Sequence, residues 1–396
     1  MKITFLGDML CLESMNKAFE TTDGRHDYSE LFSAMKPYFE QSDFVAANLE
    51  TPITESDDLT DEETRFNTPI EFAEAAKESG IHFVATANNH CLDRDLNGLD
   101  TTIDCLNKVG LLHTGTFKTR DEERHTIVNV GGIRLGILSY TYGTNFHSNR
   151  VKLAKKDAWK VNLFQAQELN NPIERLLYDH QYNRWVKRIK RVAQKIYPDR
   201  YLYYPWERRQ RCRTQMKRLR KDIANLQRQH VDLTIMFMHI GGQFRPQAVP
   251  YTKRMTDWLF RHGINIVVGS HEHVVQGIDF SLRKENKIGT YCLGNFDGTY
   301  GISQWTQKDF MCQYSIAWNV YVDKDENKNV HLVKTTYSIL KSVSAGGGRM
   351  YTIPCYDLYQ SLSSREEKED LLKDMTEISR RFCSKPISTV EAEYEV

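Results

Sequence analysis

Apolar runs alternate with polar segments along this chain, and five of the runs end in residues that bind metals or transfer protons. Short runs rich in Val, Ile and Phe predict buried β-strands. The five predicted strands end at Asp8, at Asn48 and Glu50, at Asn88 to His90, at His239, and at the pair His271 and His273. Ligands of open α/β sheets bind at the carboxyl ends of the strands. The pattern therefore predicts a metal-dependent site at one sheet edge.

The segments between these strands predict helices and further strands. Helical patterns cover residues 70–78, 98–109, 215–229 and 364–383. Thr68 and Pro69 are expected to begin the first helix as N-cap and first helical residue, and Gly80 and Gly110 to follow the first two helices. A strand over residues 133–140 runs into a polar loop at 141–145. Strands alternating with helices are typical of a parallel sheet in an α/β fold.

The C-terminal third changes character. Apolar segments over residues 311–321 and 330–337 flank a polar turn at 323–327, which predicts an antiparallel hairpin. A last amphipathic helix follows, and the tail behind it is expected to be frayed.

A basic, aromatic-rich segment interrupts the α/β pattern after residue 164. Residues 151–229 hold 21 Lys and Arg side chains but only 7 Asp and Glu. Trp185, Ile189, Val192 and Ile196 recur at helical spacing, so the segment is expected to be a helical insertion. The predicted organisation has a first part over residues 1–164, an insertion over 165–215 and a second part over 216–396.

The whole-chain composition excludes few functions. The 396 residues carry 53 basic and 52 acidic side chains, so net charge indicates no particular partner. No run approaches the roughly 20 apolar residues that span a bilayer, and no secretory leader is visible at the start. The eight cysteines form no Cys-x-x-Cys pair, which favours reduced thiols. We therefore expect a cytoplasmic protein.

The chemistry of the strand ends admits two interpretations at each position. His271 and His273 can both face one cleft as ligands, or they are surface-loop residues, and Glu272 between them is expected to point elsewhere. Asp8 either binds a metal or caps the next helix. Asn48 and Glu50 offer an amide oxygen and a carboxylate, or they form a turn before Pro52.

The other strand ends supply a candidate general acid and a glycine beside which the backbone can approach a bound ion. Asn88 and Asn89 offer neutral oxygens, while His90 can protonate a leaving group with Asp93 to orient it. Gly241 follows the strand of His239 and lets the backbone approach an ion or anion closely. Jointly these residues supply ligands for one or two divalent ions, Mn²⁺, Zn²⁺ or Fe²⁺. No Gly-x-Ser-x-Gly elbow, Walker loop or Rossmann fingerprint competes with that interpretation.

Seven motifs in order resemble the CapA family of bacterial poly-γ-glutamate capsule synthesis proteins, which are related to calcineurin-like metallophosphoesterases. The motifs are Gly7-Asp8, residues 48–53, Ala87 to His90 with Asp93, residues 139–145, His239-x-Gly241-Gly242, residues 269–277 around His271 and His273, and residues 293–296. Together they cover about the first 300 residues, interrupted by the basic segment.

The resemblance implies a four-layer α/β/β/α sandwich of the metallophosphoesterase type. It also implies metal contacts at Asp8, Glu50, Asn89, His239, His271 and His273, with His90 as proton donor and Asn295 as a substrate contact. Two departures stand out. Leu10 replaces a histidine that metallophosphoesterases carry, so one of two metal sites lacks a ligand, and Gln243 stands where many relatives have an acidic residue.

Two functions of different class remain open. The first is a metal-dependent hydrolase that acts by a metal-activated water on a phosphoester or on a γ-glutamyl or other amide polymer. Asn48, Asn88, Gly241 and Asn295 are its predicted substrate contacts. The second is a non-catalytic module whose insertion, residues 165–215, binds a polyanion such as nucleic acid or poly-γ-glutamate. The same charges are equally typical of a solvated helical hairpin or an oligomer contact.

Overall fold

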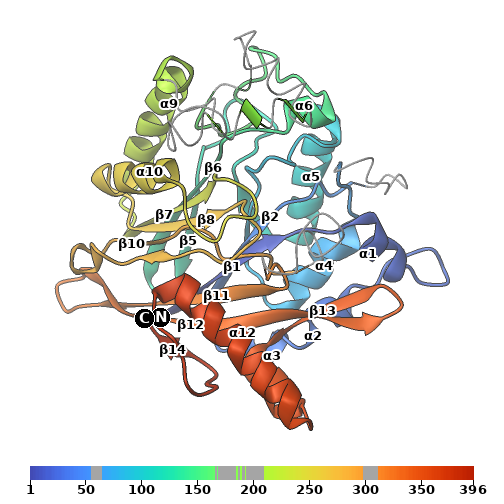
Figure 1. The fold of residues 1–396 in the computed structure, drawn as a ribbon. Helices are drawn as coiled ribbons and strands as arrows, with labels where there is room; N and C mark the ends of the chain where they lie inside the picture. The colour runs from blue at the N-terminus through green and yellow to red at the C-terminus, as the bar shows by residue number, and fades with distance from the viewer. Residues whose placement is uncertain are drawn as a thin grey trace.

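Two β-sheets packed face to face form the centre of the molecule (Figure 1). The computed structural model describes residues 1–54, 65–165, 167, 184–185, 188–189, 192, 209–297 and 311–396. Helices cover the outer faces of both sheets, so the predicted four-layer α/β/β/α sandwich is confirmed.

The first sheet combines parallel strands from the N-terminal part with an antiparallel C-terminal extension. Its order is β13-β12-β11-β1-β2-β3-β4, with β14 paired to β12. The strands β1 to β4 are parallel neighbours, whereas β11 pairs antiparallel with β1. The bounds are β1 Lys2–Met9, β2 Phe44–Leu49, β3 Phe83–Ala85, β4 Leu112–Thr114, β11 Tyr314–Lys324, β12 Val330–Gly346, β13 Arg349–Pro354 and β14 Tyr394–Glu395.

The second sheet contains the strands that end in the three predicted histidine ligands. Its order is β5-β6-β7-β8-β10-β9, in which β6, β7 and β8 are parallel. The bounds are β5 Thr126–Val130, β6 Ile133–Thr141, β7 Leu233–His239, β8 Ile266–Ser270, β9 Ile278–Asp279 and β10 Ile288–Thr290. The expectation of a single sheet edge is therefore wrong, because the five predicted strand ends belong to two sheets.

The main core lies between the two sheets. Alternation along β11 directs Ile316, Trp318 and Val320 inward to this core, while Ala317 faces the helices outside. Strands of both sheets are thus buried on both faces, which requires the continuous apolar runs seen in the sequence. Helix α12 also packs its apolar side, including Met375 and Phe382, against this core.

The outer helices fall into two groups by the sheet they cover. Apolar side chains from the segment of α1 to α5 pack on the first sheet, and those of α9 and α10 pack on the second. The bounds are α1 Glu13–Ala18, α2 Ser29–Ser33, α3 Lys36–Phe39, α4 Ile70–Ser79, α5 Asp95–Val109, α6 Phe146–Asn149, α9 Arg209–Gln227, α10 Pro250–Arg261, α11 Cys355–Ser361 and α12 Arg365–Cys383, with a short 3₁₀ turn at Arg283–Glu285.

The predicted helix ends are mostly confirmed. Gly80 and Gly110 follow α4 and α5 in the left-handed conformation. The predicted start of α4 is wrong, because Pro69 occupies the N-cap position and no side chain caps the helix. The Thr68 hydroxyl instead forms a hydrogen bond with the Thr51 hydroxyl, 2.7 Å between the oxygens.

The C-terminal hairpin is confirmed and is longer than predicted. Strands β11 and β12 pair antiparallel over their full facing lengths. The prediction of a frayed tail is wrong. Tyr394 and Glu395 form β14 on β12, and the Glu393 carboxylate holds the tail through Lys2 and Tyr321.

Most of the predicted insertion lies outside the described residues. Trp185, Ile189 and Val192 are described and are exposed. Helix α9 begins at Arg209 and so crosses the predicted boundary at residue 215, and the domain boundaries stay predictions. Among the described residues, none of the helices is long and apolar enough to cross a membrane.

Candidate metal centre

The predicted ligands converge where the carboxyl ends of the two sheets meet. Asp8 lies near the end of β1, Glu50 directly follows β2, and His239 is the last residue of β7. Asn89 stands in the turn after β3, and His271 and His273 come directly after β8. Side chains up to 265 positions apart in sequence thus line one buried cluster.

A close approach between two backbone segments brings Asp8 to this cluster. A Cβ at Gly7 would lie 1.9 Å from the Gly294 carbonyl oxygen, so no side chain fits there. The Asp8 amide donates to that carbonyl at 3.0 Å, and the Phe296 amide donates to the Asp8 carbonyl at 2.8 Å. Asn295 is thereby held beside Asp8.

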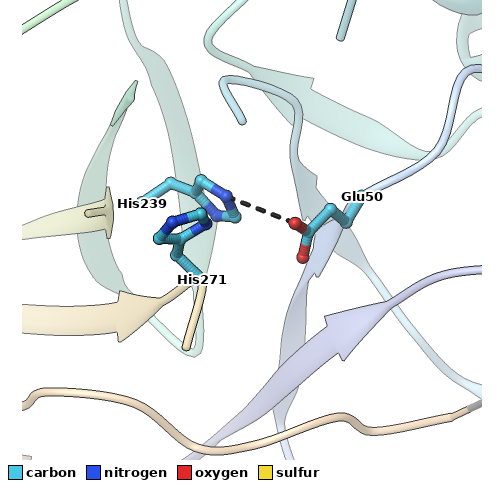
Figure 2. Close-up of side chains that lie close together, drawn as sticks. All are labelled: Glu50, His239 and His271. Atoms are coloured by element: carbon cyan, nitrogen blue, oxygen red, sulfur yellow. Dashed lines mark ion pairs between the residues drawn. The ribbon is translucent and has the colours of Figure 1, made fainter. Parts of the chain in front are cut away.

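Two groups of three side chains have the spacing of a metal site. Glu50, His239 and His271 form one group, and Asp8, Glu50 and His273 form the other. Within each group, the potential ligand atoms lie within 4.8 Å of one another, and all the residues are buried. Figure 2 shows the Glu50 carboxylate facing both imidazoles of the first group, with 3.4 Å between Glu50 Oε1 and His239 Nε2. Glu50 belongs to both groups and would contribute a ligand to an ion held by either of them.

Several ligand atoms are buried without a hydrogen-bond partner. These atoms are both carboxylate oxygens of Glu50 and Nδ1 of His271. Buried polar atoms are rarely left unsatisfied, and an ion is one accepted reason for exceptions. His273 Nδ1 donates to Asn295 Oδ1 at 2.9 Å, which leaves the lone pair of Nε2 available for a metal. The donor set therefore fits a divalent cation.

Asn89 and Ser270 orient the imidazole of His239. Asn89 Oδ1 lies 2.5 Å from His239 Nε2, so this amide stands directly beside the first ligand group. On the other side of the ring, Ser270 Oγ lies 2.9 Å from Nδ1. Asn89 thus lies beside the first ligand group, and its role as a neutral ligand stays a prediction.

Burial disfavours the charged forms of the ligands while no cation is bound. It raises the pKa of Asp8 to about 8, and the neighbouring Glu50 adds to that rise. It also raises the pKa of Glu50. The same burial lowers the pKa of His239 to about 3 and the pKa of His271 well below its usual value. Neutral imidazoles are the form that binds metals, whereas Asp8 must lose a proton when an ion binds.

His90 and Asp93 form a buried pair beside the ligand groups. His90 Nδ1 lies 2.6 Å from Asp93 Oδ2, and the imidazole stacks on the Phe66 ring with 4.1 Å between centroids. Burial lowers the pKa of His90, but Asp93 together with the carboxylates of Glu50 and Asp8 outweighs burial, and the pKa is raised. The other Asp93 oxygen accepts from Asn149 at 3.3 Å. His90 is therefore held in one orientation by Asp93 and Phe66.

Three of the four predicted substrate contacts form hydrogen bonds within the site, and the fourth, Gly241, lies against Glu272. Asn48 donates to Asp8 Oδ1 at 2.8 Å, and Asn295 accepts from His273. Asn88 donates to the Leu49 carbonyl and accepts from the His90 amide, so it shapes the turn. A Cβ at Gly241 would lie 1.8 Å from Glu272 Oε1, so Glu272 fills the space beside this glycine. Their contacts with substrate stay predictions.

Three residues next to the site are missing from the sequence-based set. Asn145 Nδ2 lies 3.3 Å from His90 Nε2, the Tyr142 ring lies 4.6 Å from that of His271, and Asn149 supports Asp93. Tyr142 and Asn145 were detectable, because their polar loop follows a strand whose carboxyl end meets the same edge. Asn149 carries no such signal.

A two-sheet α/β sandwich with acidic and histidine ligand groups between its strand ends defines a metallophosphoesterase-like protein. Residues 2–299 match the family described as "Bacterial capsule synthesis protein PGA_cap", and the chain belongs to this family. The match contains every predicted site residue.

Two curated relatives are similar over much of the chain. The "Capsule biosynthesis protein CapA" of Bacillus anthracis is 22% identical over 80% of this chain and 64% of its own length. The "PGA biosynthesis protein CapA" of Bacillus subtilis (strain 168) is 20% identical over 80% of this chain and 68% of its own length. The aligned part of the chain therefore spans just under two thirds of the Bacillus anthracis protein.

Proposed function

We propose that this protein is a metal-dependent hydrolase that cleaves a phosphoester or a γ-glutamyl or related amide bond in an anionic polymer. The observation that carries the proposal is the pair of buried ligand groups that share Glu50. The polymer is suggested by the names of the two relatives, which refer to capsule and PGA biosynthesis.

The ligands in this proposal are Asp8, Glu50, Asn89, His239, His271 and His273. A divalent ion held by them, Mn²⁺, Zn²⁺ or Fe²⁺, supplies Lewis acidity toward a phosphoryl or carbonyl oxygen and lowers the pKa of a water molecule. Each group already contains three ligands, and Glu50 connects them. The replacement of a histidine by Leu10 therefore leaves enough ligands for two ions.

His90 is the proton donor in this proposal. Asp93 accepts the Nδ1 proton and fixes the ring, so Nε2 is the atom that faces a leaving group. Asp93 stabilises the imidazolium of His90 against the effect of burial, and the pKa of His90 is raised. Asn145 contacts the same Nε2 atom and lies where the leaving group would approach.

The test combines metal analysis with hydrolysis assays. Elemental analysis should find one or two divalent ions per chain in the wild type and fewer in the His271→Ala variant. Phosphodiesters and γ-glutamyl peptides should be hydrolysed with Mn²⁺ or Zn²⁺. His90→Ala should retain the metal but lose roughly 10²–10⁴-fold in kcat, as expected for loss of a general acid. Wild-type activity in both variants would eliminate the proposal.

The alternative is a binding module for a polyanion without catalysis. The basic charge between residues 151 and 229 favours it, although the predicted insertion lies mostly outside the described residues. A metal-free wild-type protein that binds a polyanion and hydrolyses none of the substrates would support this alternative.

A further inference from the structure

Helix α9 has a stripe of basic side chains that is not part of the candidate metal centre. Arg213, Lys217, Arg220, Lys221 and Arg228 are all exposed. Residues three, four and seven positions apart lie on one face of a helix. The first four of these side chains therefore form one stripe along the outer face of α9, and Arg228, in the turn directly after the helix, extends the stripe.

The inner face of α9 contains the packing that holds this stripe in place. Leu219, Ile223 and Leu226 are buried in the core between α9 and the second sheet. Asp222 is the only acidic residue of the helix, and it is buried where it accepts a hydrogen bond from the Tyr140 hydroxyl. The helix thus contributes no carboxylate to its outer face.

No ion pair neutralises the stripe within the described part of the chain. None of the ion pairs found there involves its five basic side chains. Like charges at i and i+4, such as Arg213 with Lys217 and Lys217 with Lys221, each destabilise a helix by a few tenths of a kcal/mol. A bound polyanion would replace this repulsion by attraction.

Helix α10 extends the basic surface. Arg254, Trp258 and Arg261 recur at helical spacing, and both arginines are exposed. The Arg220 guanidinium lies 5.5 Å from the centre of the Trp258 ring, which places the two helices side by side there. The name α9–α10 face is used below for the five basic residues of the stripe together with Arg254 and Arg261.

The composition of this face favours carboxylates over nucleic acid. Arginine binds both carboxylates and phosphates through paired hydrogen bonds, so the difference must come from contacts with the bases. Single-stranded nucleic acid also needs aromatic rings on which bases stack. Trp258 is the one aromatic residue that α10 adds beside the stripe, and its ring already stacks on His262 at 3.7 Å and carries Arg220.

The face also approaches the edge of the sandwich that holds the metal centre. Helix α9 ends at Gln227 and β7 begins at Leu233, so the two run in opposite directions. The N-terminal half of α9, with Arg213 and Lys217, therefore lies toward the end of β7 that carries His239. In Figure 1, α9 rises past α10 to the same end of the molecule as α6.

We propose that the α9–α10 face is a docking surface for a polymer of carboxylate groups, which it holds alongside the metal centre. The identity of this partner as a polycarboxylate rests on the proposed function, whereas the binding itself needs no hydrolysis. Arg213 and Lys217 then contact the polymer nearest the metal centre, and Arg228 contacts it farthest away.

The experiment measures binding of fluorescently labelled poly-γ-glutamate of defined length. The test variant carries Arg213→Gln, Lys217→Gln, Arg220→Gln and Lys221→Gln. The control variant carries Lys36→Gln, Lys108→Gln, Lys284→Gln and Lys328→Gln, four exposed lysines on other elements. We expect at least a tenfold increase in Kd for the test variant and less than a twofold increase for the control.

Salt dependence and chemical protection provide independent readouts. Raising salt from about 50 to about 200 mM should weaken wild-type binding steeply, and much less so for the test variant. The polymer should also protect Lys217 and Lys221 of the wild type from acetylation, a result that does not depend on how the variant folds. Equal losses in the test and control variants, or no protection, would overturn the proposal.

Two further binding measurements distinguish this proposal from its alternatives. If single-stranded DNA of the same charge binds tenfold more tightly than the polymer, the polycarboxylate assignment is wrong. Glu50→Gln should lose the metal yet bind the polymer as the wild type does. If the protein proves not to be a hydrolase, this binding should still be observed. If the wild type is active but does not bind the polymer, only the proposed docking surface is wrong.

Discussion

His271 and His273 have positive φ angles, which are unusual for residues other than glycine. Their φ angles are 109° and 60°, and the first lies outside the usual left-handed basin. Such conformations cost of the order of 1–3 kcal/mol each and persist where the surroundings impose them. Here the strained backbone turns two imidazoles, only two positions apart, toward the same buried carboxylates.

This strain can be measured by comparing His271→Gly with His271→Ala. Both variants lose the imidazole, but only glycine relieves the backbone at φ 109°. Without metal, His271→Gly should be more stable than His271→Ala by about 1–3 kcal/mol in urea unfolding. His262 at φ −104° is the control, where glycine should be the less stable replacement. If the glycine variant is the less stable one at both positions, the backbone of His271 is not strained.

Metal affinity should depend on pH through Asp8. Burial raises the pKa of Asp8 from 3.8 to about 8 without metal, so the stability that its proton gives to the metal-free fold is fully present below pH 3.8 and is lost as the pH rises to about 8. Metal binding must release that proton. Affinity should therefore fall by up to about tenfold for each pH unit below 8, measured by calorimetric titration with Mn²⁺. Asp8→Asn should flatten this dependence, and an unchanged slope would exclude Asp8 as its source.

At the scale of elements, the junction between β1 and the segment around Gly294 fixes the position of Asp8. Gly7→Ala would place a Cβ 1.9 Å from the Gly294 carbonyl, so the two segments must separate. We expect a loss of about 1–3 kcal/mol in stability, as for overpacked cores, together with weaker metal binding. Gly143→Ala is the matched control, because nothing lies within 4 Å of its added Cβ. Thermal unfolding of both variants with and without metal checks the prediction.

The sequence predicts where strands end better than how they assemble. An apolar run stopped by Asp8 or His239 is visible in the chain, and so is the glycine that ends a helix. The division of the strands between two sheets is not visible, because buried strands of either sheet give the same continuous apolar run. The expectation of one sheet edge fails for this reason, although the ligands converge.

Short elements held by distant contacts also escape sequence-based prediction. Strand β14 contains only Tyr394 and Glu395 and carries no periodic signal. Its place depends on the Glu393 carboxylate, which bonds to Lys2, 391 positions away, and to Tyr321. The site shows the same limit, because Asn149 is recognisable as a support for Asp93 only once the loop has folded onto it.

At the scale of the whole molecule, the candidate metal centre lies between the two sheets of the sandwich. Asp8 and Glu50 come from the first sheet, while His239, His271 and His273 come from the second. Each ligand group contains residues from both sheets. An ion bound by either group would therefore cross-link the sheets at the edge where the main core ends. Binding should then stabilise the entire fold, since a ligand that binds only the native state stabilises it by about 4 kcal/mol at 1,000 times Kd.

Chelation should reverse that stabilisation, and Glu50 should control it. EDTA is expected to lower the Tm of the wild type, whereas Glu50→Gln should show the same Tm with and without metal, since Glu50 belongs to both ligand groups. Burial raises the pKa of Glu50, so its ionised form destabilises the metal-free fold at neutral pH. Metal-free Glu50→Gln should accordingly be at least as stable as the metal-free wild type. A metal-dependent rise in the Tm of this variant would show that the sheets are joined without Glu50.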